Sequence, residues 1–410
     1  MGAVGGAAAA LVTTGAAAAL ATPRASARRP DAIRARDEPR VREVDVVTGR
    51  RAYRRPLSQR SRHTGGPLLS PAVVLVATDP LFAEHDPGRG HPERPARLDA
   101  VLAGLDRVGL DAASRTDLGR RPATRAELER VHPAEYLDRL EQICASGGGS
   151  LDPDTSVSER SFDAAVCAAG AGLAAIEALD AGLSDSAFLA VRPPGHHAVP
   201  AHAMGFCLLN NIAIAAAALV ARGERVLVVD WDAHHGNGTQ AIFEESPAVF
   251  YVSLHEWPLY PGTGRLDETG VGAGVGTTLN FPLPAGATGD VYLEALDTVV
   301  SPAVEQFAPG WVLVSAGYDA HRADPLTGLD LSAGDFADLT ARVAAFAPAP
   351  GRLVVFLEGG YDLQALSDSV AATVGTLAGV AQQREPATSG GPGRRVVAAA
   401  RELWHPPALA

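Results

Sequence analysis

The sequence contains no lysine, and arginine supplies all 35 of its basic residues. We attribute this to compositional bias in the coding genome, because arginine carries the same charge. Acidic residues outnumber basic ones by 47 to 35, which gives a formal net charge of −12. An acidic chain is poorly suited to nucleic acid, so we expect no direct nucleic-acid binding.

Cysteine is also scarce, with Cys144, Cys167 and Cys207 as the three thiols. An odd number without CxxC spacing argues against a disulfide framework and is typical of a reducing compartment, so we expect a cytoplasmic protein. Strongly hydrophobic runs are missing near the N-terminus. Residues 3–21 are uncharged, but they are mostly alanine and glycine and follow no basic signal segment, so we expect no membrane association.

Composition divides the chain into three parts. Residues 1–70 are of low complexity and predict a disordered N-terminal arm; since the first thirty residues contain no acid, an organelle transit peptide is the alternative. Residues 71–382 form the predicted catalytic domain, and the Gly-, Pro- and Arg-rich residues 383–410 predict a loose tail. Overall, 47% hydrophobic and 20% charged residues are enough for a large core.

Within the domain, short apolar runs alternate with helical patterns. Most runs are unbroken by polar residues, as is typical of buried parallel strands. The predicted strands are 71–78, 188–191, 226–230, 248–254, 277–283, 311–315 and 353–357. The predicted helices cover 97–105, 125–146, 161–183, a segment ending near 221, a segment capped by Ser332 and Asp335, and a last one ending near 381. This alternation predicts an α/β fold with one mostly parallel sheet flanked by helices.

The most informative stretch follows the strand at residues 226–230. That strand ends on Asp230, and Asp232, His234 and His235 come directly after it. Asp232 and His234 are two residues apart on an extended segment, so their side chains point to the same side. Ligands bind at the carboxyl ends of strands in such sheets. Together with Asp319, after a later strand, these residues predict a site of two carboxylates and one imidazole, which suits zinc but also Fe(II) or Mn(II).

Two other strand ends carry groups suited to catalysis. His196 and His197 follow a rigid Pro-Pro-Gly turn and are candidates for general base and acid, because neutral imidazole titrates near pH 7. Tyr361 follows two glycines and is a candidate hydrogen-bond donor to an oxyanion. The plainer interpretation of the two histidines is a hydrogen-bonded pair in a turn, and the plainer interpretation of Asp319 is a helix cap.

Seven motifs in the order of one known family support the catalytic interpretation. They span about residues 72 to 380 and are His91-Pro-Glu-Arg-Pro, Arg192-Pro-Pro-Gly-His-His, Gly205-Phe-Cys-Leu-Leu-Asn-Asn, Asp230-Trp-Asp-Ala-His-His-Gly-Asn-Gly-Thr-Gln, Pro258-Leu-Tyr-Pro-Gly-Thr-Gly, Ser315-Ala-Gly-Tyr-Asp-Ala-His and Glu358-Gly-Gly-Tyr. The chain resembles the histone deacetylase family of zinc amidohydrolases, in its class II branch. The resemblance implies an arginase–deacetylase fold with a central sheet of about eight strands.

The resemblance also implies roles for individual residues. It implies one catalytic Zn²⁺ held by Asp232, His234 and Asp319. It implies that Asp230 orients His196, and that Asn237 lies where the family places the partner of His197. In this scheme His197 acts as base and then as acid, His196 is an electrostatic partner, and Tyr361 stabilises the oxyanion. A structural K⁺ is implied as well, at Asp230, Ser253 and the carbonyls of Asp232, His234 and Leu254.

Substrate contacts are implied less directly. Gly205 and Phe206 resemble one wall of the family's narrow channel, and the opposite wall is expected within residues 257–260, with Trp257 as the candidate. Leu326 stands where relatives that prefer acetylated polyamines can carry a glutamate. Asp152 or Asp154 is expected to bind substrate; we take Asp152 as the first candidate and leave Asp154 open.

Four functions remain in competition at this stage. The favoured one is zinc-dependent deacetylation of acetyl-lysine in proteins. The others are hydrolysis of acetylpolyamines or another small acetylated amine, non-catalytic binding of acetyl-lysine, and an arginase-like dimanganese hydrolase. An intact ligand set and Tyr361 disfavour the binder, and too few aspartates follow the strands for the dimanganese enzyme. The sequence leaves the oligomeric state open.

Overall fold

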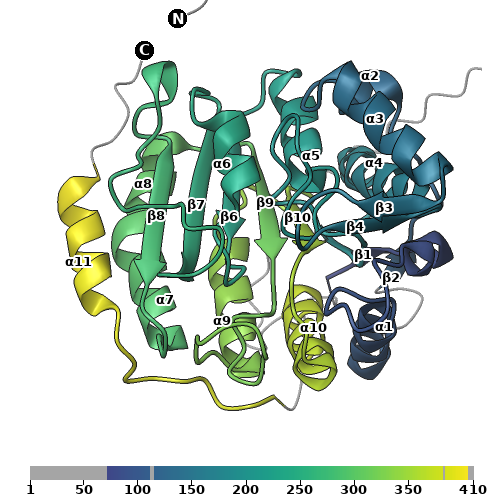
Figure 1. The fold of residues 1–410 in the computed structure, drawn as a ribbon. Coiled ribbons are helices and arrows are strands. Elements are labelled where there is room, and N and C mark those ends of the chain that lie inside the picture. The colour runs from purple at the N-terminus through teal and green to yellow at the C-terminus, as the bar shows by residue number, and fades with distance from the viewer. Residues whose placement is uncertain (1–71, 111–114, 382–383, 405–410) are drawn as a thin grey trace, which may run out of the picture. The chain divides into compact units, whose positions relative to one another are not determined.

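The computed structural model describes residues 72–110, 115–381 and 384–404. The predicted disordered arm, residues 1–70, lies outside the described residues. At the centre is a sheet of eight strands that pair in parallel throughout (Figure 1). In spatial order the strands are β2 (Arg115–Asp117), β1 (Val74–Ala77), β5 (Ser186–Leu189), β10 (Leu353–Leu357), β9 (Trp311–Ala316), β6 (Val226–Asp230), β7 (Val249–Glu256) and β8 (Thr278–Leu283).

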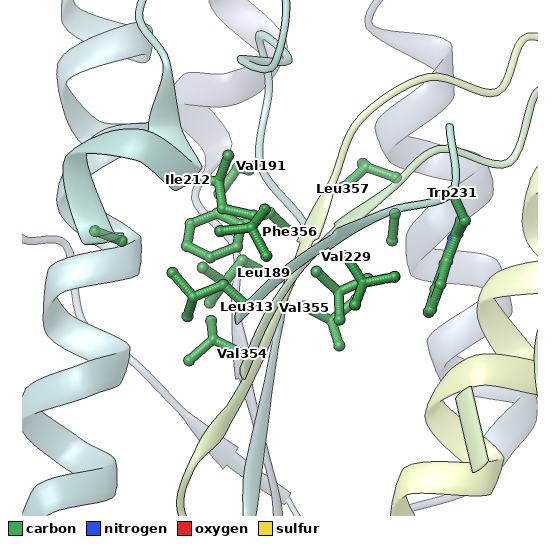
Figure 2. Packing of buried hydrophobic residues seen from close by; sticks show 14 of the residues in the cluster. Leu189, Val191, Ile212, Val229, Trp231, Leu313, Val354, Val355, Phe356 and Leu357 are labelled. Atoms are coloured by element: carbon green, nitrogen blue, oxygen red, sulfur yellow. The ribbon is translucent and has the colours of Figure 1, made fainter. Parts of the chain in front are cut away.

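The predicted parallel sheet is confirmed, because helices cover both of its faces and leave its central strands fully buried. Successive residues of a strand point to opposite layers. In Figure 2, Phe356 packs with Ile212 on one side of the sheet, while Val355 and Leu357 lie with Trp231 on the other. β2 was missed by the sequence prediction because only three residues pair there.

The helices form the two outer layers. One layer contains α3 (Ala134–Ala145), α4 (Ser161–Asp180) and α5 (Asn211–Val220), and the other contains α1 (Ala96–Val108), α9 (Ala333–Ala344) and α10 (Leu363–Ala378). The remaining segments are η1 (Pro80–Glu84), α2 (Arg125–Leu128), α6 (Asn237–Phe243), η2 (Gly272–Gly274), α7 (Gly289–Ala295), the π-helical η3 (Leu296–Val300), α8 (Ser301–Phe307) and an antiparallel pair, β3 (Gly148–Ser150) and β4 (Ser156–Ser158).

Two details of the helices differ from or refine the prediction. The prediction of a single helix over residues 125–146 is wrong, because α2 and α3 are separate helices. Pro133 lies directly before α3, and proline disfavours the helical conformation of the residue that precedes it. The capping box of α9 is confirmed, since the side chains of Ser332 and Asp335 each accept from the other's backbone N–H. α4 is long and apolar enough to cross a membrane by length and composition, but most of it is buried in this core.

The prediction of a loose C-terminal tail is also wrong for residues 384–404. Glu385 accepts a hydrogen bond from Ala333 N and lies 2.9 Å from His321 Nε2, and the Thr388 hydroxyl donates to Asp335. The chain then forms α11 (Arg394–Leu403), which packs against β8 and α7 (Figure 1). Composition misled the prediction, because the Gly/Pro-rich residues only lead into a short amphipathic helix.

The docking of α11 can be tested with a pair of matched substitutions. Val397 is buried in the contact, whereas Ala398 beside it is exposed. Val397→Asp buries an unpaired carboxylate, and we expect it to lower the free energy of unfolding by about 3 kcal/mol. Ala398→Asp should change it by less than about 0.5 kcal/mol. Equal thermal denaturation of the two variants would contradict the docking.

Candidate active site

The three predicted metal ligands come together at the carboxyl end of the sheet. Ligand atoms of Asp232, His234 and Asp319 all lie within 4.8 Å of one another. His234 Nδ1 is 3.2 Å from Asp232 Oδ1 and 3.1 Å from Asp319 Oδ2. They meet because β6 and β9, which they follow, are neighbours in the sheet.

Backbone groups hold the two carboxylates of this cluster in place. Asp319 Oδ1 accepts from Ala233 N at 2.9 Å, and Asp232 Oδ2 accepts from Gly359 N at 2.9 Å. Both carboxylates are buried, and burial together with the charge of Asp232 raises the pKa of Asp319. Two buried carboxylates and an imidazole around one point fit a divalent cation, which would neutralise their charge and leave a further coordination position open.

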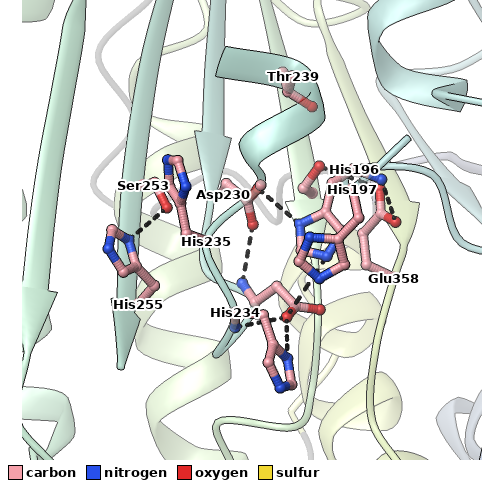
Figure 3. A network of polar contacts seen from close by, with 12 residues as sticks. His196, His197, Asp230, His234, His235, Thr239, Ser253, His255 and Glu358 are labelled. Carbon is pink, nitrogen blue, oxygen red and sulfur yellow. Dashed lines mark hydrogen bonds and ion pairs between the residues drawn. The ribbon is translucent and has the colours of Figure 1, made fainter. Parts of the chain in front are cut away.

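The two tandem histidines have different partners. His196 Nδ1 lies 3.0 Å from Asp230 Oδ2 (Figure 3). His197 Nδ1 lies 2.8 Å from Asn237 Oδ1. Asn237 Oδ1 can only accept, so His197 Nδ1 donates its proton to it and the neutral ring keeps the lone pair on Nε2. The ring centroids of the two histidines are 4.0 Å apart. The expected pairings of His196 with Asp230 and of His197 with Asn237 are therefore present in the structure.

Their surroundings drive the two histidines toward opposite protonation states. Burial opposes the charge on His196, but Asp232, Asp230 and Glu358 outweigh it and raise its pKa to about 10. Burial lowers the pKa of His197 well below its ordinary value, and the charges of His196 and His234 lower it further. His196 is thus suited to be a cationic partner, and His197 to be a neutral base.

Tyr361 enters the same site from the loop after β10. Its ring packs edge-on to Phe206, with centroids 5.8 Å apart, and the Arg97 guanidinium lies 5.0 Å from its centroid. The Asp324 carboxylate accepts from Tyr361 N at 2.7 Å. Burial raises the pKa of the Tyr361 hydroxyl well above its ordinary value, so it remains a hydrogen-bond donor at neutral pH.

A buried ionic network beneath Tyr361 was not assigned a role from the sequence. Arg97 Nε donates to Gly360 O at 2.7 Å, and its Nη1 to Glu93 Oε1 at 3.1 Å. Glu93 also pairs with Arg192, and all three side chains are fully buried. Burial opposes the charge of Glu93, yet Arg192 and His85 hold its pKa well below the ordinary value. The signal was present in Glu93 of the His-Pro-Glu-Arg-Pro motif and in Arg192 of the following motif, but these two residues are 99 positions apart in the sequence.

A cavity of about 220 Å³ opens above the metal ligands and the tandem histidines. It is lined by Asp154, His197, Gly205, Phe206, His234, Leu259, Tyr260, Leu326 and Tyr361. Three of the predicted channel residues are therefore in place: Gly205, Phe206 and Leu326. Gly205 has a φ of +56° and lies against the His197 ring, where a Cβ would overlap the imidazole. Phe206 shares the left-handed conformation at φ 67°, and its N–H donates to Thr155 Oγ1 at 3.0 Å.

Two predicted channel residues, Trp257 and Asp152, do not line this cavity. Trp257 N donates to Leu283 O at 2.7 Å, which continues the sheet pairing and places the side chain beside Arg265 and Leu403. Leu259 and Tyr260 form that wall instead, and the Tyr260 ring is 5.2 Å from the His197 ring between centroids.

The two candidate aspartates also differ in position. Asp152 turns toward His202, 3.7 Å from its Nε2, and its Oδ1 accepts from Asp154 N at 3.0 Å. Asp154 is the one that lines the cavity. Both lie on the turn between β3 and β4, where no regular periodicity predicts which side chain faces the cavity, so the sequence could not separate them.

The residues expected to bind K⁺ surround the ends of β6 and β7. Asp230 and Ser253 are paired in register, and Leu254 follows Ser253 on β7. Ser253 Oγ lies 2.9 Å from His255 Nδ1 (Figure 3). Potassium binding stays a prediction. His255, and the 2.8 Å contact of His235 Nδ1 with Thr263 Oγ1, were not anticipated.

The role of His197 can be tested through its partner. In Asn237→Asp a carboxylate replaces the neutral amide beside His197 Nδ1, and opposite charge favours the imidazolium, so the pKa of His197 rises. We expect the acid limb of the kcat/KM profile to move to higher pH by about 1 unit or more. An unchanged acid limb in a folded variant would show that His197 is not the titrating base.

Comparisons with known proteins agree with this geometry. A model of the histone deacetylase domain matches residues 91–377. The chain is 43% identical to the histone deacetylase-like amidohydrolase of Pseudomonas aeruginosa, over 66% of this chain and 73% of that protein. It is 40% identical to a probable deacetylase of Archaeoglobus fulgidus, over 69% of this chain and 80% of the relative.

Related chains also occur in plants, and one of them has a solved structure. Histone deacetylase 10, chloroplastic, of Oryza sativa is 40% identical over 75% of this chain and 73% of that protein. The crystal structure of the HDA15 HD domain superposes with a TM-score of 0.75 at 36% identity, covering 81% of this chain and 94% of that chain. The fold is therefore the arginase–deacetylase fold, and the chain belongs to the histone deacetylase family.

Proposed function

We propose that this deacetylase hydrolyses the N-acetyl amide of acetyl-lysine in proteins, in a zinc-dependent reaction that gives lysine and acetate. Membership of the family and the names of the relatives support a deacetylase or amidohydrolase. The observation that carries the finer proposal is the convergence of the metal cluster, the neutral His197 and Tyr361 on one cavity.

Asp232, His234 and Asp319 would hold the Zn²⁺. A bound zinc ion polarises a carbonyl and lowers the pKa of water from about 16 toward 7. The nitrogen and carboxylate donors suit zinc, and their fixed backbone hydrogen bonds keep them in place for it.

His197 carries the proton in this mechanism. Its Nε2 lone pair takes the proton of the attacking water, and the same nitrogen later gives that proton to the leaving amine. Asn237 fixes the ring in the required tautomer through Nδ1. His196 stays charged, beside Asp230, and its positive charge helps to keep His197 neutral in the resting enzyme.

Tyr361 supplies a hydrogen bond to the oxyanion that forms when water adds to the amide carbon. A donor of this kind is worth about 3–4 kcal/mol in the transition state. Arg97 orients the tyrosine without touching substrate, because it binds the carbonyl of Gly360 and lies over the phenol ring.

The cavity walls support a substrate with an alkyl stem. Phe206 and Tyr260 offer aromatic faces, and Leu259 and Leu326 add apolar surface. Leu326 is uncharged and partly exposed at this cavity, so it offers no negative charge to bind the distal ammonium of a polyamine. Asp154 is the acidic group of the cavity and is placed to accept hydrogen bonds from the backbone of a bound peptide.

One observation favours a second candidate, a small acetylated amine with another positive charge. Asp152 and Asp154 lie close together, and burial together with Asp152 raises the pKa of Asp154. A cation beside this pair would be attracted to it. The same catalytic residues would serve both substrates.

The first experiment compares acetate release from an acetyl-lysine peptide and from an acetylated polyamine by the zinc-loaded protein, with Tyr361→Phe as control. We expect faster turnover of the peptide, and a fall of about 100-fold or more in kcat for the variant because the oxyanion loses its donor. Preference for the polyamine would replace the first candidate by the second. A metal-loaded protein that releases acetate from neither substrate would overturn the proposed reaction.

A further inference from the structure

A second group of metal-ligating side chains includes one of the two tandem histidines. His196, Cys207 and Glu358 are fully buried, and their ligand atoms lie within 4.8 Å of one another. They come from three separate segments: the turn after β5, the loop before α5 and the end of β10. Imidazole, thiol and carboxylate together form a donor set typical of zinc and of softer divalent ions.

His196 offers one nitrogen to this group once that nitrogen gives up its proton. Its Nδ1 is engaged with Asp230, which leaves Nε2 as the possible ligand atom. Histidines that bind metals usually have their other nitrogen hydrogen-bonded to a carboxylate or a carbonyl, as here. Nε2 is 3.8 Å from Asp232 Oδ1, which is outside hydrogen-bonding distance.

Cys207 and Glu358 would bind as anions. Burial, and then the charge of Glu358, raises the pKa of the Cys207 thiol, whereas backbone N–H groups of His197 and Ala198 lower it. Glu358 Oε2 accepts from Gly195 N at 2.6 Å and from His196 N at 3.2 Å. Among the residues that the structure describes, Glu358 Oε1 accepts only from the Ser315 hydroxyl, at 3.2 Å, and so retains a lone pair for a cation.

We propose that His196, Cys207 and Glu358 form a second, inhibitory site for a thiophilic divalent ion such as Zn²⁺ or Cd²⁺. Binding releases the thiol proton of Cys207 and the Nε2 proton of His196. An ion on Nε2 takes the place of the imidazolium proton of His196, whose ring centroid is 4.0 Å from that of His197, and so changes the electrostatic environment of the base. The inhibition rests on the proposed function, whereas binding of the ion does not.

The test begins with protein that holds one equivalent of zinc. Cd²⁺ is added while the ultraviolet charge-transfer absorption of cadmium–thiolate bonds is followed, and metal is counted after gel filtration. We expect a second equivalent to bind with a thiolate signal in the native chain. In Cys207→Ala the signal should be lost, and the inhibition constant of excess Zn²⁺ should rise by about tenfold or more, since loss of even an outer partner of a metal ligand costs about that much.

The other two thiols provide matched controls. Cys144 and Cys167 are buried in α3 and α4, away from this group. The double variant Cys144→Ala/Cys167→Ala keeps Cys207 as its single thiol and should keep both the signal and the inhibition. This variant assigns the signal even if Cys207→Ala fails to fold.

Three results would overturn the proposal: no thiolate signal in the native chain, a signal that survives in Cys207→Ala, or loss of the signal in the double variant. A protein that binds the second ion with this signature but shows no deacetylase activity would contradict the proposed function alone.

Discussion

The structure depends on keeping negative charge buried where strands of the sheet end. Asp230, Asp232 and Asp319 are at most 1% exposed, and they cluster because β6 and β9 are adjacent. Unpaired, such carboxylates would cost several kcal/mol each. Their neighbours offset this charge: His196 lies beside Asp230, His234 lies between Asp232 and Asp319, and backbone N–H groups of the turns donate hydrogen bonds. The cation that this arrangement favours is also the reagent that the proposed hydrolysis requires.

The buried negative charge also sets the protonation of the two tandem histidines. It raises the pKa of His196, and charged His196 in turn lowers that of His197. A second layer of paired charge, made by Glu93, Arg97 and Arg192, fixes the loop that carries Tyr361. Removing one partner of a buried ion pair costs about 3–5 kcal/mol of folding stability. These ion pairs therefore hold the loop that carries Tyr361 in one position. Catalytic geometry and stability are therefore maintained by the same contacts.

The parallel sheet and the cluster of Asp232, His234 and Asp319 were predictable, because both follow from short local patterns: unbroken apolar strands, and polar residues directly after them. The errors arose where geometry depends on contacts between distant segments. Trp257 was misplaced because backbone pairing to β8 turns it away from the cavity, and α11 was missed because Val397 and Ala400 find their partners on β8 and α7. In the network around Glu93, Arg192 is 99 positions from Glu93 and Gly360 is 263 positions from Arg97, and no local pattern reveals such contacts.

The central claim is that Asp232, His234 and Asp319 bind the catalytic ion. X-ray absorption at the zinc edge, on protein holding one equivalent of zinc, tests it most directly, with Asp319→Asn as the comparison. The account predicts first-shell scattering from oxygen and a single imidazole nitrogen, at about 2.0–2.2 Å and without sulfur, and weakened binding in the variant. A sulfur ligand in this one-zinc protein, several imidazoles, or a spectrum and affinity unchanged by the substitution would contradict it.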